Sequence, residues 1–316
     1  MKTIFCPLLK TKRVSEKNAV LALKETIEKR DDVIPYFELI QDSTDSVAIK
    51  YLTIFDKSSF FAEPKNNDEL ASLFAYDYLI PVFNVTTQTK PSEINEFITT
   101  GHNNSRPIGI RIVDSDVRFF GLVNRLLLTN DYLFIDIDKN DYKASSFLLI
   151  VNKLVKVYKT IIISNERSIS YSGKEFSKYD ESFPTDKLFN VSVISSIKDG
   201  SFGFDGFGSY CAAKNDLTEE IKIAVTVFGY FLIFDFKQNN FFVSSTEDSE
   251  HISKVYNNLI DKIYSTGSDV LTLVSSTPIS KGMLDDAYAA CKLSCPRKIT
   301  IEITHYIEEI IKQLDK

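Results

Sequence analysis

Short apolar segments recur along the chain at intervals that suit a buried strand followed by a helix. Seven of them are rich in β-branched and aromatic residues and contain few polar residues: IFCPLL, VIPYFELI, LIPVFNVT, PIGIRIV, YLFIDID, TIIIS and FNVSVIS. A strand buried on both faces has this composition, whereas a strand with one exposed face alternates apolar and polar residues. The pattern therefore predicts parallel strands inside a sheet.

Segments with the period of an amphipathic helix lie between most of these strands. Residues 15–30 begin with Ser15, which suits a helix N-cap, and place apolar side chains on one side. Further helices are predicted from Pro91 onward, over residues 119–128 and over residues 145–157. Strands that alternate with helices indicate βαβ units with right-handed crossovers.

A long series of such units favours an α/β fold of the (β/α)8, TIM-barrel-like type over a doubly wound open sheet. No strand is followed by the glycine-rich phosphate turn that opens most dinucleotide-binding folds. The segments VIPYFELI and LIPVFNVT are nearly the same, with Glu38 and Asn84 at matching positions, as expected for two strands of a quasi-repetitive barrel. The sequence predicts one barrel-like domain over residues 1–316.

Three regions depart from this alternation of strands and helices. Residues 41–78 contain an additional apolar segment and a polar loop, and we predict that they form an insertion at the barrel rim. Residues 221–245 follow the glycine-rich stretch GSFGFDGFGSY, which is interpreted as a tight lid. Their alternation is typical of a three-stranded antiparallel meander, with turns near Phe228-Gly229 and after Lys237. Residues 250–316 are predicted to be C-terminal helices, the last with a strong apolar stripe.

Composition and charge restrict the class of protein. The chain has 316 residues, of which 44% are hydrophobic, and such a composition excludes wholesale disorder. Its net charge of −6 disfavours nucleic acid as a partner, because binding to phosphate backbones depends on basic side chains. No apolar run is long enough for a signal peptide or a membrane span, so we expect a cytoplasmic protein without a membrane partner. The four scattered cysteines indicate reduced thiols.

Polar residues stand near the carboxyl ends of the predicted strands, where a parallel barrel carries its functional groups. They are Lys10, Glu38, Asn84, Arg111, Asp114, Asp136, Asp138, Asn165 and Glu166, with Tyr210 at the end of the glycine-rich stretch. This ring contains enough carboxylates for general acid–base chemistry and enough cations to orient an anion.

The segment FIDID carries the most specific pair of carboxylates. Asp136 and Asp138 leave the same face of their strand, about 7 Å apart along the chain. Together with Glu38 they could bind a divalent metal such as Mg²⁺, which prefers oxygen ligands. Alternatively, one caps the next helix and the other pairs with a cation of the rim. Glu38 and Glu166 could also form the carboxylate pair of a glycosidase-like site, although the chain has no Trp to stack on a sugar.

Four segments carry a resemblance to a known family. They are CPLLKTKR near the N-terminus, VIPYFEL, GFDGFGSY before the predicted meander, and PRKITIEITHYIEEI at the end. Together they resemble the phage and bacterial beta-protein family, whose members are described as TIM-barrel-like "beta family proteins" of similar length. The family's patterns fall on Pro7, Leu9 and Lys10, on Ile34, Pro35 and Glu38, and on Gly206, Phe207 and Tyr210. Ser209 departs from the pattern, because members often have Asp there.

This resemblance implies an association with phages, mobile elements and antiviral defence. With the polar ring it leads to the hypothesis of a barrel whose rim binds a ligand or partner in a defence or counter-defence system. The predicted ligand is a small anionic group, and the predicted ligand-binding residues are Lys10, Asn84, Arg111, Asn165 and Tyr210.

Two alternatives remain at this stage. One is a metal-assisted hydrolase of a phosphodiester or nucleotide, with Glu38, Asp136 and Glu166 as catalytic residues and Asp136 and Asp138 as metal ligands. The other is a scaffold that docks a protein encoded by a neighbouring gene through the predicted meander and the last helix.

Overall fold

The structure is a computed structural model of the chain, and it describes ten segments. These are residues 2–10, 14–39, 59–137, 146–164, 182–184, 191–211, 227–238, 240–249, 252–265 and 269–316. The chain divides into two compact units, whereas the sequence predicts one domain. The barrel unit comprises Met1–Arg13, Lys24–Ser164 and Ser192–Ser209, and the C-terminal unit comprises Val14–Leu23, Asn165–Val191 and Tyr210–Lys316.

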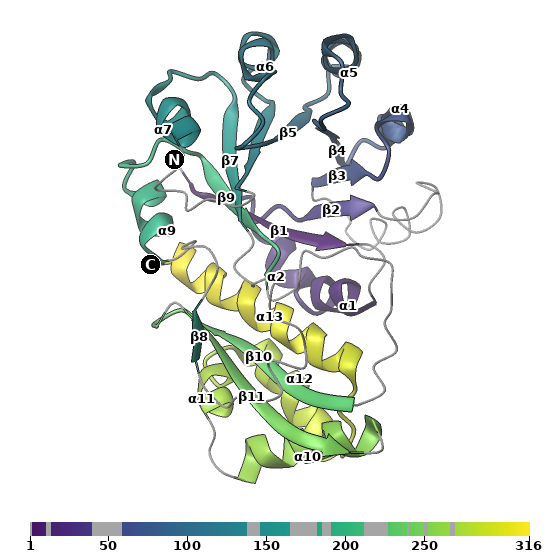
Figure 1. The fold of residues 1–316 in the computed structure, drawn as a ribbon, viewed down its shortest axis with the longest axis vertical. Coiled ribbons are helices and arrows are strands. Elements are labelled where there is room, and N and C mark those ends of the chain that lie inside the picture. Colours follow the sequence, from purple (N-terminus) through teal and green to yellow (C-terminus); the bar gives the residue numbers. More distant parts are fainter. Residues whose placement is uncertain are drawn as a thin grey trace. The chain divides into compact units, whose positions relative to one another are not determined.

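Eight parallel strands close into a barrel in the first unit, in the order β1-β2-β3-β4-β5-β6-β7-β9 (Figure 1). They are β1 (Ile4–Lys10), β2 (Tyr36–Leu39), β3 (Phe60–Pro64), β4 (Leu79–Asn84), β5 (Gly109–Val113), β6 (Tyr132–Asp136), β7 (Lys159–Ser164) and β9 (Gly206–Ser209). Strand β9 pairs with both β1 and β7 and thereby closes the sheet. The α/β, (β/α)8 TIM-barrel-like fold is confirmed.

Helices occupy most of the connections between these strands. They are α2 (Lys24–Glu28), the short 3-10 helix η1 (Asn67–Glu69), α4 (Leu70–Leu73), α5 (Pro91–Asn103), α6 (Phe120–Leu126), α7 (Ser146–Lys153) and α9 (Val191–Lys198). Helix α5 shows why they form where they do. It begins at Pro91, which needs no N–H at that position, and it buries Ile94, Phe97 and Ile98 at helical spacing.

Two predictions about the barrel strands are wrong. The segment FNVSVIS is predicted as a strand, but residues 191–198 form α9, in which the buried Ile194 and Ile197 follow helical rather than alternating spacing. Residues 41–78 are predicted as a rim insertion, yet Phe60–Pro64 forms the barrel strand β3 between β2 and β4. The residues of this region before Ser59 lie outside the described part of the chain.

The last part of the glycine-rich stretch, Gly206–Ser209, is the barrel strand β9 rather than part of a lid. Gly206 and Gly208 lie in β9, where the neighbouring strands leave no space for side chains. A Cβ atom at Gly206 would lie 2.2 Å from the Ile4 carbonyl oxygen, and one at Gly208 would lie 2.7 Å from Leu8 Cδ1. The glycines therefore serve close strand packing in the barrel.

The C-terminal unit contains a three-stranded antiparallel sheet and five helices in its described part (Figure 1). The strands, in the order β10-β11-β8, are β10 (Val227–Asp235), β11 (Asn240–Ser249) and β8 (Ser182–Pro184). The helices are α1 (Val14–Ala22), α10 (Ile252–Ser265), α11 (Asp269–Val274), α12 (Pro278–Ala289) and α13 (Cys295–Leu314). Apolar residues of β10 and of α10–α13 share one core. The Thr300 hydroxyl donates to the Ser15 carbonyl and joins α13 to α1.

The sheet differs from the predicted meander in two respects. Its third strand is β8, far away in the sequence, while residues 221–226 lie outside the described part. Gly229 is predicted in a turn but lies within β10, next to a shift in register. A Cβ atom there would lie 2.4 Å from Val255 Cγ1, so the glycine permits close approach of α10.

Candidate functional site

Six polar side chains gather inside the barrel at the carboxyl ends of its strands. We call them the rim layer: Lys10, Glu38, Glu63, Asn84, Arg111 and Asp136. In the register of the sheet, Glu38 stands between Lys10 on one side and Glu63 on the other. Alternate residues of a strand share one face. On each of β1 to β6, the member of the rim layer lies on the face that points into the barrel. This is the end of the barrel at which (β/α)8 proteins place their functional groups.

Arg111 is the centre of the rim layer. Its Nη1 donates to Glu38 Oε1 at 2.7 Å and to Glu63 Oε2 at 2.8 Å, and its Nη2 donates to Asp136 Oδ2. Arg111 lies on β5 and Glu38 on β2, so this contact crosses the barrel interior. Both side chains are buried.

The remaining members complete the hydrogen bonding of Glu63. The Asn84 amide donates to Glu63 Oε1 at 2.8 Å, and the Tyr36 hydroxyl donates to Glu63 Oε2. Lys10 is buried as well, with its Nζ 3.8 Å from Glu38 Oε2. The carboxylate of Glu63 thus has three different donors, a set that holds it in one orientation.

An aromatic layer forms the floor beneath these charges. Phe134 packs edge-on against Tyr36 and Phe61, with ring centroids 5.0 and 4.8 Å apart. Tyr132 packs edge-on against Phe61 at 4.7 Å. The apolar floor lowers the local dielectric and so strengthens the charge interactions above it.

Burial shifts the protonation equilibria of Glu63 in the rim layer and of the neighbouring Tyr36. It raises the pKa of Glu63, and the neighbouring Glu38 carboxylate adds to this, while Arg111 opposes it. Burial and the adjacent Glu63 also raise the pKa of the Tyr36 hydroxyl well above its usual value. When fully ionised, the layer has two cations and three carboxylates, and the raised pKa of Glu63 favours its protonated form relative to a carboxyl group in water.

The structure brings five of the predicted site residues together: Lys10, Glu38, Asn84, Arg111 and Asp136. The predicted Asp138, Asn165 and Glu166 lie outside the described residues, so the Glu38–Glu166 pair stays a prediction. Tyr210 directly follows β9 and is buried, and it belongs to the C-terminal unit.

Sequence reasoning missed Glu63 and Tyr36. Glu63 lies in the segment that is interpreted as an insertion. The sequence does contain a signal for Glu63. In FFAEP a short apolar run is followed by Glu63, just as Phe37 is followed by Glu38.

The carboxylates of the rim layer surround a guanidinium group. Among the residues that the structure describes, no cluster of three or more His, Cys, Asp or Glu side chains could hold a metal ion. The Arg111 guanidinium occupies the position between Glu38, Glu63 and Asp136 that a metal ion would need. Metal binding by Asp136 and Asp138 stays a prediction.

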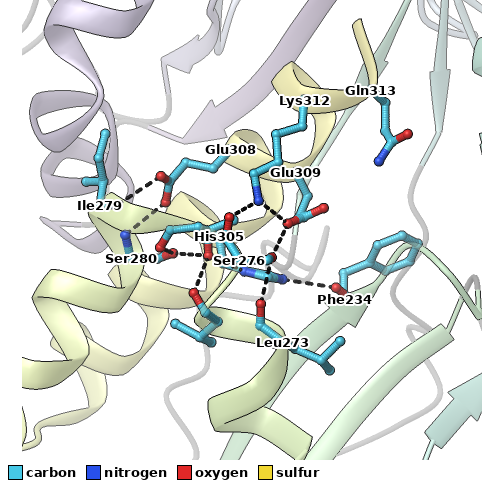
Figure 2. Close-up of polar contacts among 12 residues, drawn as sticks. Phe234, Leu273, Ser276, Ile279, Ser280, His305, Glu308, Glu309, Lys312 and Gln313 are labelled. Carbon is cyan, nitrogen blue, oxygen red and sulfur yellow. Dashed lines mark hydrogen bonds and ion pairs between the residues drawn. The ribbon is translucent and has the colours of Figure 1, made fainter. Parts of the chain in front are cut away.

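A second polar cluster surrounds His305 in the C-terminal unit (Figure 2). The His305 Nε2 donates to the Phe234 carbonyl at 3.0 Å, and Nδ1 lies 2.8 Å from Thr277 Oγ1. Glu308 accepts from the backbone N–H groups of Ile279 and Ser280 and thereby caps the first turn of α12. Burial lowers the pKa of His305 to about 4, so the imidazole is a neutral part of the core.

Within the described segments, no helix combines the length and the apolar composition that crossing a bilayer requires. A comparison of the chain with models of protein families finds no match, and a comparison with curated proteins finds none either. The resemblance to the beta-protein family therefore stays a prediction.

Proposed function

We propose that the barrel binds a small polar ligand at the rim layer. The observation that carries this proposal is the burial of charge at the carboxyl ends of the strands, where Lys10, Glu38, Glu63 and Arg111 are each at most 8% exposed. Removing a charged side chain from water costs several kcal/mol, and apolar side chains of similar volume often stabilise a fold as well or better. A buried charged layer at this end of a barrel is therefore better explained by recognition than by stability.

The exposed members of the layer indicate the chemistry of the ligand. Asn84 and Asp136 are half-buried, whereas the cations Lys10 and Arg111 are almost fully enclosed. A ligand entering from the rim would first meet an amide and a carboxylate. This favours a ligand with hydroxyl or amine donors. To bind the anionic ligand predicted from the sequence, Lys10 or Arg111 would have to replace a contact with a carboxylate of the rim layer by a contact with the ligand.

The biological setting of the proposal comes from the resemblance. We place the protein in the cytoplasm, in an antiviral defence or counter-defence system of phages and their hosts. In that setting, ligand binding at the rim layer would affect how the protein binds a partner encoded by a neighbouring gene. This part rests on the four sequence segments, and the barrel is compatible with it.

A hydrolase is the second candidate, and the Glu38–Glu63 pair favours it. Both carboxylates contact one nitrogen of Arg111, and burial raises the pKa of Glu63. Neighbouring carboxyl groups that differ in protonation can serve as acid and base. The metal-assisted version predicted from the sequence depends on Asp136, whose carboxylate contacts Arg111.

Native mass spectrometry of the full chain, purified gently from its own host, tests the proposal. We expect a co-purifying small molecule that is lost in Asp136→Asn and in Asn84→Ala. Glu96→Gln is the matched control, because this exposed carboxylate on α5 lies outside the rim layer. A preparation without any bound small molecule, or a molecule retained by both rim variants, would contradict the proposal.

A further inference from the structure

A cavity of about 690 Å³ opens at the amino-terminal mouth of the barrel, away from the rim layer. Its lining includes Ile80, Tyr132 and Lys159, which lie at the beginnings of β4, β6 and β7, and Pro107 and Asn130, which precede strands. This volume lies within the range of sites for small organic ligands, and the mixed lining of apolar and polar groups is also typical of them.

The aromatic floor separates this cavity from the rim layer. Tyr36, Phe61 and Phe134 pack against one another between the two ends, with ring centroids 4.8 to 6.0 Å apart. Tyr132 belongs to the lining of the cavity and not to the rim layer. The amino-terminal mouth of such barrels usually contributes stability rather than function. A site here therefore needs its own evidence.

That evidence is the Lys159 ammonium group. Its Nζ donates to the Tyr132 hydroxyl at 3.1 Å and lies 4.9 Å from the centre of that ring. Across the described segments, no carboxylate lies within 4.0 Å of Lys159. The other two cations of the lining differ, because Arg30 pairs with Asp32 and Lys29 pairs with a glutamate on α2.

The Tyr132 hydroxyl is a second donor for a hydrogen-bond acceptor of a ligand at this point of the cavity wall. It accepts a hydrogen bond from Lys159 and keeps its own proton to donate. An ammonium group and a phenol proton therefore meet at one place on the cavity wall. A carboxylate, with two oxygens that each accept hydrogen bonds, matches such a pair of donors.

We propose that the amino-terminal cavity binds a small organic carboxylate with an apolar body. The carboxylate contacts Lys159 and Tyr132, and the apolar body packs on Ile80, Pro107 and the Tyr132 ring. A monoanion fits better than a phosphate dianion, because Lys159 is the one cation of the described lining that has no carboxylate partner. The proposal is independent of the ligand at the rim layer.

Calorimetric titration of the full chain with 2-naphthoate tests this site, with 2-naphthamide as the neutral probe of the same shape. We expect saturable binding of the naphthoate, and binding of the amide that is weaker by about tenfold or more, as expected for a lost charge-assisted hydrogen bond. Lys159→Met should cause a similar loss. Lys29→Met, in the same cavity, should change the affinity by less than about threefold, because solvent screens the charge of the exposed Lys29 side chain.

Two further measurements keep the result interpretable. Glu96→Gln, an exposed change on α5 outside the cavity lining, should leave naphthoate binding unchanged. In the unmutated protein, naphthoate should protect Lys159 from reductive methylation, read by mass spectrometry of the peptides, which avoids any folding defect of a variant. The proposal is overturned by absence of saturable binding, by equal binding of the amide, by equal losses in Lys29→Met and Lys159→Met, or by an unprotected Lys159.

Discussion

Replacing Arg111 with Met removes the centre of the rim layer while retaining much of the volume of the side chain. Glu38 and Glu63 then lose donors at 2.7 and 2.8 Å, and Asp136 loses its contact as well. A hydrogen bond to a charged group contributes about 1.5–3 kcal/mol, so three of them would contribute up to about 9 kcal/mol if they were additive. Proton uptake by the carboxylates limits the loss, and we expect about 3–5 kcal/mol, as for other broken buried pairs.

The pH dependence of this loss follows from the same geometry. Arg111 lowers the pKa of Glu63 and thereby opposes the effect of burial, so its removal raises that pKa further. A carboxyl group whose pKa is higher in the folded than in the unfolded state binds its proton more tightly in the folded state. It stabilises the fold at low pH, and this contribution is lost as the pH rises through the folded pKa. The deficit of Arg111→Met should therefore be smaller at pH 5 than at pH 8.

Urea unfolding followed by circular dichroism at these two pH values measures the deficit. Arg125→Met is the matched control, because Arg125 is exposed on α6 and donates to the Gly121 carbonyl in its own helix. Hydrogen exchange of peptides from β2, β3 and β5 assigns the loss to the barrel unit. A loss below about 1 kcal/mol, as for a surface ion pair, or a deficit that is larger at pH 5, would refute the reasoning.

Two further predictions concern the core of each unit. Burial lowers the pKa of His305 to about 4, so the unfolded chain protonates His305 at a higher pH than the folded chain does. As the pH falls from about 6.5 to about 4, the free energy of unfolding of the C-terminal unit should therefore decrease by about 3 kcal/mol. Urea unfolding across this range should show a flatter pH dependence for His305→Gln, and equal slopes would count against the prediction. Gly206→Ala should destabilise the barrel by more than about 2 kcal/mol, because the new methyl group would meet the Ile4 carbonyl oxygen. Gly121→Ala, which faces open space in α6, should change stability by less than about 1 kcal/mol, and equal melting temperatures for the two variants would exclude a clash at Gly206.

The sequence by itself determined the fold class and most of the rim layer. Six of the eight barrel strands are continuous apolar runs, which identify buried parallel strands without any tertiary information. The polar residue that ends such a run must lie near the carboxyl rim once the strands form a barrel. This is why Lys10, Glu38, Asn84, Arg111 and Asp136 could be named as neighbours before their contacts were known.

Tertiary structure alone decided the other two strands and the pairing within the rim layer. β3 runs directly into the polar segment after Pro64, and β9 alternates glycine with other residues, so neither is a long apolar run, and only pairing with neighbours makes them strands. The sequence alone therefore did not identify Glu63, although Tyr36, Asn84 and Arg111 all donate to its carboxylate. Contacts across the barrel, such as Arg111 with Glu38, join residues on strands that do not pair with each other. They depend on closure and register, which the full set of strands determines together.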